Sequence, residues 1–228
     1  MLLSAAWLAG GDASGLGPEG GGRPKGSGSP PRPSIVVMLT DDQRADTLSS
    51  MPILQRELVV SGITFANAVV ATPLRCPSRA TLLTGRYAHS RRLPHRGLYG
   101  GVEAFPDDDT LPVWLQRAGS TTALVGKYLN GYKGARVPPG WDRWRAFSWG
   151  WGYFDYRLVD ERGRVRRFGS GLEEYSTHVL AREAVDFIRR AARPFFLLLA
   201  PAAPHEPALP RPGDRGRLGD LPPQRRPA

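Results

Sequence analysis

The sequence predicts an α/β fold in which helices pack on a mostly parallel sheet. Three observations lead to this fold class. The run SIVVMLT at 34–40 is apolar and rich in β-branched residues, and the run PFFLLLA at 194–200 is apolar throughout; both are typical of strands buried on both faces. A third run at 121–125 has the same character. Segments with helical spacing lie between these runs, and strands that alternate with helices indicate an α/β layer architecture.

The expected elements follow in chain order, with turn and cap residues at their ends. The clearest is a helix at 175–192, because Leu180, Ala184, Phe187, Ile188 and Ala191 share one face at a spacing of 3.6 residues. The full set is a strand at 34–40, a helix at 53–60, a strand at 63–70, a helix at 78–84 stopped by Gly85, a helix from Thr110 to Gly119, a strand at 121–125, a hairpin at 156–168 that turns at 161–163, the helix at 175–192 and a strand at 194–200.

The two ends of the chain differ in composition from its centre. We expect 1–33 to be a disordered leader and linker, 34–210 to be the folded domain, and 211–228 to be an irregular basic tail. An apolar start before a Gly/Ser/Pro tract favours export, although a chance Ala/Leu/Gly leader gives the same pattern. The string at 8–11 also differs by one residue from a bacterial lipoprotein box, which needs Cys where Gly11 stands.

Composition limits the kinds of function. A single Cys excludes a disulfide framework and a cysteine-built zinc site, and no apolar run reaches the roughly 20 residues of a membrane helix. The formal net charge of +10 suggests a polyanionic partner, but 28 of the 31 basic residues are Arg and most are scattered. This matches GC-rich codon usage better than a basic stripe, so we do not expect nucleic-acid binding. The oligomeric state stays open.

Asp41 and Asp42 come directly after the first buried strand. Ligand sites in α/β sheets lie at the carboxyl ends of strands, and two adjacent carboxylates there suit a hard cation such as Ca²⁺ or Mg²⁺. A helix N-cap followed by an acid in the first turn is an equally good interpretation of the pair.

Three further polar groups follow strands or open a helix. Ser78 can cap a helix that places Arg79 in its first turn, where a cation opposes the helix dipole and so indicates a second task, such as holding an oxyanion. Lys127 and Asn130 follow the 121–125 strand, and His205 follows the 194–200 strand between two prolines. An ordinary capped surface helix and a structural histidine are the alternatives. Together the four groups fit one anion-and-metal site for attack on a tetrahedral oxyester.

Four strings of the sequence resemble motifs of the sulfatases in the alkaline phosphatase superfamily, and they occur in the family's order. They are IVVMLTDDQRADTL, LRCPSRATLLTGRY, GKYLNGY in the variant of the glucosamine-6-sulfatase-like members, and APAAPHEP. The resemblance runs from about 34 to 210. It implies the N-terminal portion of an alkaline-phosphatase-like α/β sandwich whose function is to hydrolyse sulfate esters of small molecules or sulfated glycans.

The resemblance also implies roles for single residues. In the family, a signature cysteine oxidised to formylglycine attacks the sulfur, while calcium and basic side chains neutralise the sulfate oxygens. By position, Asp41 and Asp42 would bind calcium, and Arg79 would hold the formylglycine hydroxyl. Lys127 would contact sulfate, and His205 would assist sulfate binding or protonate the leaving group. Asn130 falls in the same substrate-binding segment.

Two departures from the family predict weak or absent turnover. The signature places the nucleophile two residues before Pro77, at Arg75, so the single Cys76 falls on the variable position beside it, and Arg cannot become formylglycine. Relatives are also longer and carry a second pair of metal ligands beyond the histidine loop, which we expect this chain to lack. The alternatives are a non-catalytic binder of sulfate or sulfated glycans, and a phosphodiesterase or phosphonate hydrolase of the same superfamily.

An aromatic-rich stretch precedes the predicted hairpin. These side chains could stack on sugar rings, whereas covering the core is the more common use of such residues. They are Trp141, Trp144, Trp149, Trp151, Tyr153 and Phe154.

Overall fold

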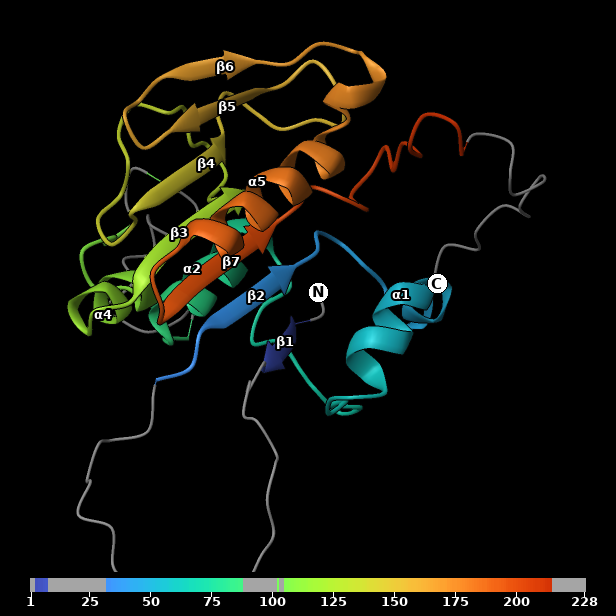
Figure 1. Cartoon of the computed structure of the whole chain (residues 1–228), viewed down its shortest axis with the longest axis horizontal. Coiled ribbons are helices and arrows are strands. Elements are labelled where there is room, and N and C mark those ends of the chain that lie inside the picture. The colour runs from blue at the N-terminus through green and yellow to red at the C-terminus, as the bar shows by residue number, and fades with distance from the viewer. Residues whose placement is uncertain (1–2, 8–31, 88–101, 103–104, 215–228) are drawn as a thin grey trace, which may run out of the picture.

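The computed structural model of this chain describes residues 3–7, 32–87, 102 and 105–214. Its centre is one seven-stranded sheet with the order β1-β2-β7-β3-β4-β5-β6 (Figure 1). The strands are β1 (Leu3–Trp7), β2 (Ile35–Leu39), β3 (Thr121–Gly126), β4 (Arg143–Phe147), β5 (Arg157–Asp160), β6 (Val165–Arg167) and β7 (Phe195–Ala200). Neighbours among β2, β7, β3 and β4 run parallel, and antiparallel strands close both edges. The predicted α/β class with a mostly parallel sheet is confirmed.

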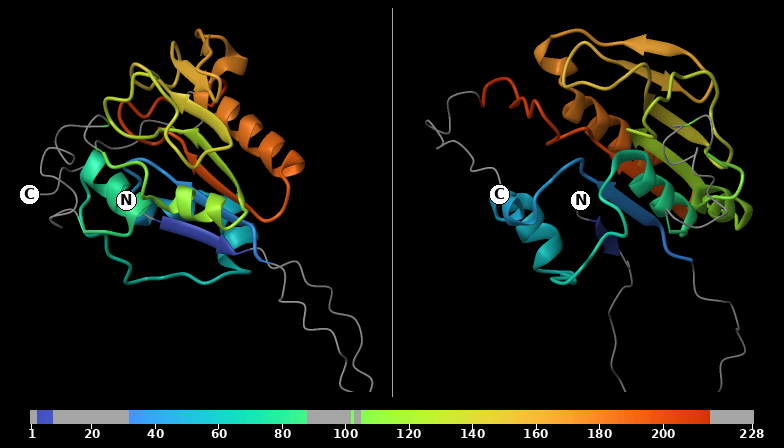
Figure 2. Two further views of the ribbon diagram at one scale, coloured as in Figure 1. Left: turned by 90° about the vertical axis from the view of Figure 1, so that its left-hand side faces the viewer. Right: turned by 180° about the vertical axis from the view of Figure 1, so that it is seen from behind.

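Helices cover both faces of the sheet and so form three layers, as the two views of Figure 2 show. The helical elements are η1 (Ala45–Ser50), α1 (Pro52–Leu54), η2 (Gln55–Val59), α2 (Arg75–Thr84), α4 (Leu111–Arg117), η4 (Leu172–Glu174) and α5 (Ser176–Arg190). Alternate residues of the central strands point to opposite faces. Leu124 and Leu198 therefore join the core beneath α2, whereas Val125 and Leu197 join the core beneath α5. Within the described residues, no helix has both the length and the hydrophobicity to cross a membrane.

Most of the predicted elements are present. The predicted strands at 34–40, 121–125 and 194–200 are β2, β3 and β7, and β5 and β6 form the predicted hairpin with Arg157 opposite Arg167. The predicted helices at 110–119 and 175–192 are α4 and α5, and α1 with η2 covers most of 53–60. The predicted end of α2 is also confirmed, because Gly85 adopts a left-handed conformation and its N–H donates to the carbonyl of Thr81.

Two predicted segments are wrong. Residues 63–70 form no strand, because no described strand lies beside them to complete a ladder. The expected disordered leader at 1–33 contains β1, which pairs antiparallel with β2 and so satisfies the backbone groups along that edge of the sheet. Residues 8–31 of the leader and 215–228 of the expected tail lie outside the described residues.

Candidate functional site

Three neighbouring parallel strands deliver polar residues to one edge of the sheet. Asp41 and Asp42 follow β2, Lys127 follows β3, and His205 lies on the loop after β7. β7 lies between β2 and β3 in the sheet, so the three carboxyl ends meet at the same edge. This is the usual position of a ligand site in an α/β fold.

A glycine lets β3 and β7 approach each other closely at that edge. Gly126 has φ = 116°, and a Cβ atom built on it would lie 2.1 Å from the carbonyl oxygen of Ala200. The next N–H, that of Lys127, donates to the same oxygen at 2.7 Å. Only glycine fits here, and the tight pairing fixes the direction in which the chain leads Lys127 into the site.

Asp41 is the centre of a buried ion cluster. One carboxylate oxygen accepts from the ammonium of Lys127, and the other lies 3.4 Å from a guanidinium nitrogen of Arg79. Arg79 also donates to the carbonyl oxygen of Lys127 at 2.8 Å. The Arg79 and Lys127 side chains are each 5% exposed, and that of Asp41 is 14% exposed. The cluster therefore joins α2 to the ends of β2 and β3.

Burial acts against the charge on both cations. It lowers the pKa of Lys127 and of Arg79, and the Asp41 carboxylate opposes the shift in each case. Two cations thus share one carboxylate in a site with little access to water. An anion that entered the site would find positive charge already assembled there.

His205 lies close to the second aspartate, Asp42. Its Nε2 is 3.4 Å from a carboxylate oxygen of Asp42, which has a left-handed backbone with φ = 59°. Its Nδ1 lies 2.9 Å from the carbonyl oxygen of Glu206, so a proton on Nδ1 is donated to that carbonyl. The hydroxyl of Tyr153 donates to the carbonyl of His205 at 2.8 Å, and burial raises the pKa of Tyr153 to about 12, which keeps this donor protonated.

Trp151 contacts both Lys127 and His205 and so links the Asp41 cluster with the Asp42–His205 pair. The sequence reasoning missed this role. The Lys127 ammonium lies 5.1 Å from the centre of the indole, and the His205 ring packs edge to face against it with centroids 4.5 Å apart. The aromatic-rich composition of 149–154 is the only sequence signal for this contact. Trp141 and Trp144 are instead core residues, at 7% and 0% exposure.

The start of α2 places Arg75 and Cys76 in different environments. Leu74 stands at the N-cap position without a side-chain hydrogen bond, so the prediction of Ser78 as the N-cap is wrong, and Arg79 lies in the second turn rather than the first. The helix begins earlier because Pro77 falls within its first turn, where proline is tolerated. Arg75 is exposed, whereas Cys76 is 5% exposed and its sulfur accepts from the N–H of Asn130 at 3.1 Å.

Two aspartates form only part of a calcium site. Calcium takes six to eight oxygen ligands. Among the residues that the structure describes, no group of three His, Cys, Asp or Glu side chains could hold a metal ion. Asp41 already has two cationic partners, and Asp42 faces His205. The donor set present here therefore does not by itself fit a calcium ion.

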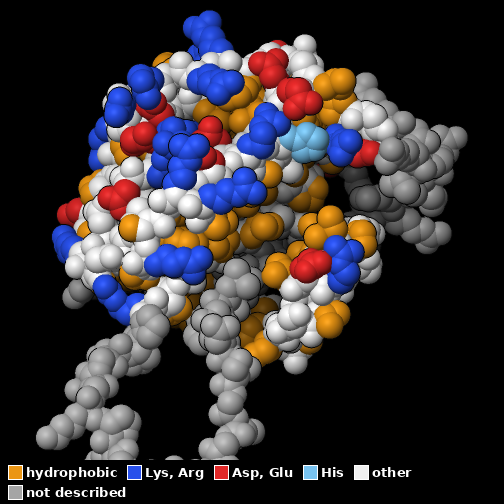
Figure 3. All heavy atoms as spheres, in the orientation of Figure 1, with side chains coloured by type: hydrophobic (Ala, Val, Ile, Leu, Met, Phe, Trp, Pro, Cys, Tyr) orange, Lys and Arg blue, Asp and Glu red, His pale blue; other side chains and the backbone are white. Residues whose placement is uncertain are grey.

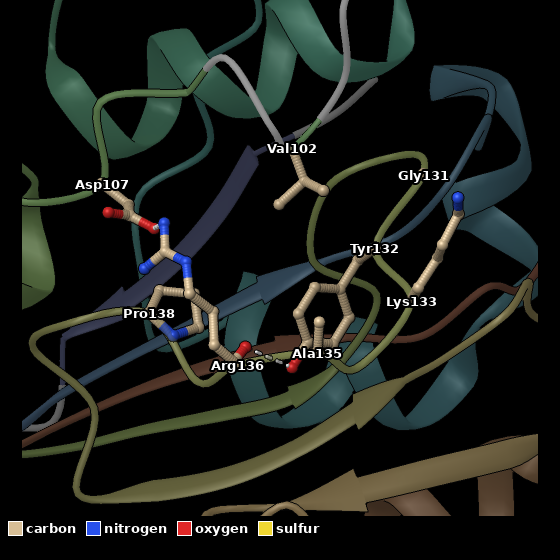
Figure 4. Close-up of a pocket in the computed structure, with 8 residues that line it drawn as sticks. All are labelled: Val102, Asp107, Gly131, Tyr132, Lys133, Ala135, Arg136 and Pro138. Carbon is tan, nitrogen blue, oxygen red and sulfur yellow. Dashed lines mark hydrogen bonds and ion pairs between the residues drawn. The ribbon is translucent and has the colours of Figure 1, made fainter.

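A separate cavity of about 280 Å³ lies beside the loop that follows β3 (Figure 4). At one end Arg136 pairs with Asp107 at 2.6 Å, and the Lys133 ammonium points away from that pair. The Tyr132 hydroxyl donates to the carbonyl of Arg136 and so holds the loop closed on itself. The lining residues are Val102, Asp107, Gly131, Tyr132, Lys133, Ala135, Arg136 and Pro138.

Comparisons with known proteins agree on one family. The family model described as Sulfatase matches residues 33–216. The chain is 34% identical over 193 residues to N-acetylglucosamine-6-sulfatase of Homo sapiens, and 35% identical over 191 residues to an arylsulfatase of Volvox carteri. These matches cover 77% and 76% of this chain but only 35% and 29% of the relatives. The chain therefore spans about a third of the length of these curated relatives.

A solved structure gives the same result at the level of the fold. It is a protein in complex with its substrate D-glucosamine-2-N,6-O-disulfate, and it matches with a TM-score of 0.68 and 29% identity over 82% of this chain and 37% of that chain. The fold, the order of the motifs and the matched family model agree, and the chain belongs to the sulfatase family.

Proposed function

We propose that this site binds the sulfate group of a sulfate ester, and that this copy of the sulfatase site has little or no turnover. Sulfatases hydrolyse sulfuric esters, and binding requires positive charge that is assembled before the substrate arrives. In this proposal Lys127, which is as buried as Arg79 but also contacts Trp151, is the cation that meets the sulfate oxygens. His205 lies beside it across Trp151, where it contacts the sulfate or protonates the leaving oxygen.

Arg79 has a positioning role in this proposal. Its guanidinium is 5% exposed and already bonds Asp41 and the carbonyl of Lys127. It holds these groups in place and adds positive charge behind them. Asn130 lies next to Cys76, and its backbone N–H donates to the Cys76 sulfur. Its side-chain oxygen is buried without a hydrogen-bond partner within the described residues.

The proposal of low turnover rests on two adjacent residues, Arg75 and Cys76. Arg75 stands at the nucleophile position of the signature and has no sulfur that could be converted to formylglycine. Cys76 is buried against Asn130, and burial raises the pKa of its thiol, so it is a protonated, enclosed group rather than a nucleophile.

The substrate class in this proposal is sulfated carbohydrate. The human relative is named for N-acetylglucosamine 6-sulfate, and the solved relative holds a sulfated glucosamine. A sugar on the exposed side of the site would lie against Trp151.

Turnover tests the proposal directly. We expect the purified chain to hydrolyse 4-nitrocatechol sulfate no faster than buffer, with calcium added. In Arg75→Cys, co-expressed with the enzyme that oxidises signature cysteines, we expect an aldehyde at position 75 by mass spectrometry. Arg75→Ala, which keeps Cys76, is the control and should gain no aldehyde. Robust hydrolysis by the native chain, or an aldehyde at position 76, would contradict the proposal.

The binding part of this proposal, in which the chain holds sulfated glycans without turnover, is favoured by the same arginine. Arg75 adds a cation at the start of α2 and leaves Lys127 and His205 unchanged. Calorimetry with a sulfated glucosamine should then show binding to the native chain that sodium chloride weakens, because the contact is ionic. The absence of heat with any sulfated saccharide would exclude this function.

A further inference from the structure

Trp151 lies where two otherwise separate contacts of the site meet. Lys127 reaches Asp41 from the end of β3, whereas His205 reaches Asp42 from the loop after β7. The Trp151 indole comes from a third segment, the loop between β4 and β5, and contacts both Lys127 and His205. Without it, no described side-chain contact links Lys127 with His205.

The contacts suit a positioning role. A Lys ammonium 5.1 Å from an indole centre is within the range of a cation–π attraction, which is strongest for a desolvated cation, and Lys127 is 5% exposed. The edge-to-face packing of His205 fixes the plane of its ring. Trp151 itself is half-buried and packs against the core beneath α5, and this packing restricts the movement of the indole.

We propose that Trp151 is a positioning residue of the sulfate site, which sets the Lys127 ammonium and the His205 ring side by side so that one anion can contact both. The binding part of this inference rests on the proposed function. The orientation of the His205 ring can be tested without any ligand.

The experiment compares three variants of the full chain. Trp151→Phe keeps an aromatic ring, and Trp151→Leu keeps an apolar side chain without a ring. Trp149→Leu is the matched control, because Trp149 is 67% exposed and contacts Lys133 rather than Lys127. Thermal unfolding shows whether each variant is folded. Calorimetry with sodium sulfate and NMR of the His ring protons, assigned with His205→Gln, are the two measurements.

We expect Trp151→Leu to bind sulfate about five- to tenfold more weakly, from the loss of a desolvated cation–π contact. It should also move the His205 ring-proton signals, which the indole ring current displaces. Trp151→Phe should keep most of the native affinity for sulfate and most of the native His205 signal positions. Trp149→Leu should match the native chain in both measurements. Native affinity in Trp151→Leu, or unmoved His205 signals, would overturn the inference. If the native chain binds no sulfate, the proposed binding fails, and unmoved His205 signals in Trp151→Leu would still exclude the contact between Trp151 and His205 on which the inference rests.

Discussion

Asp41 determines the electrostatics of the site at the scale of single residues. It is the only described carboxylate in contact with Lys127, and it also approaches Arg79. A buried pair of this kind contributes little net stability, but removal of one partner leaves a charge uncompensated. The cluster is therefore sensitive to substitutions that change charge at constant size.

The first prediction concerns Lys127→Met, which keeps the length of the side chain and removes the ammonium. Asp41 would keep only Arg79, at 3.4 Å. We expect the free energy of unfolding to fall by about 2–3 kcal/mol, less than for a fully orphaned buried charge because Arg79 remains. Urea denaturation at neutral pH measures the change.

Lys133→Met is the matched control, since Lys133 is exposed, and it should change stability by less than about 0.5 kcal/mol. Adding Asp41→Asn to Lys127→Met removes the unpaired charge and should recover part of the loss. A Lys127→Met protein as stable as the native chain would show that this ion pair is not needed for folding.

Sequence position predicts several members of the site and misses others for a physical reason. Asp41, Lys127 and His205 each follow a parallel strand, and the ends of such strands must converge. Trp151 follows β4 at a distance that only the fold of the loop determines, so composition alone leaves its use open. The predicted N-cap at Ser78 is wrong because Pro77 lies inside the helix, in a first turn that tolerates proline.

The pairing of β3 with β7 matters most at the scale of the elements. These two strands pair from Thr121 opposite Phe195 to Gly126 opposite Ala200, so the register ends at the site. Any separation of the strands at that end moves Lys127 away from Asp41.

Gly126→Ala is the prediction at this scale. The new Cβ would meet the carbonyl oxygen of Ala200 at 2.1 Å and its carbon at 2.6 Å, and both are backbone atoms that a rotamer change cannot move. With the added strain at φ = 116°, we expect a loss of about 3 kcal/mol in the free energy of unfolding. Thermal and urea unfolding provide the measurement.

Gly131→Ala is the control for Gly126→Ala. Gly131 also has a positive φ, 84°, but a Cβ atom added to it would meet nothing within 4 Å. Its cost should be about 1–2 kcal/mol, from backbone strain alone. Equal losses in the two variants would mean that the contact with Ala200 adds nothing.

The elements that sequence reasoning missed or misassigned depend on partners. The alternation of Arg143, Trp144, Arg145 and Ala146 is a strand pattern, and its arginines pair with Glu161 of the adjacent turn and Glu183 of α5. That alternation could have revealed β4. Residues 63–70 have strand-like composition, but composition does not supply the neighbouring strand that a ladder requires.

At the scale of the whole molecule, one segment stands apart from the layered body. We name residues 52–74 the exposed arm. None of the residues of α1 or η2 is buried, and Figures 1 and 3 show α1 and the chain after it beside the sheet with hydrophobic side chains outward. The large exposed side chains are Ile53, Val60, Ile63, Phe65, Val69 and Leu74, with exposures of 58% to 92%.

The last prediction is that the exposed arm drives self-association of this chain. Contiguous apolar surface favours association because its burial removes it from water. We expect the native chain to bind a hydrophobic dye and to sediment as oligomers at micromolar concentration. A triple variant, Ile63→Lys, Phe65→Lys and Val69→Lys, should lose both properties with little change in Tm, because these side chains are 72% to 92% exposed. Val185→Lys, on α5, is the control and should leave association unchanged. A native chain that sediments as a monomer without dye binding would refute the prediction.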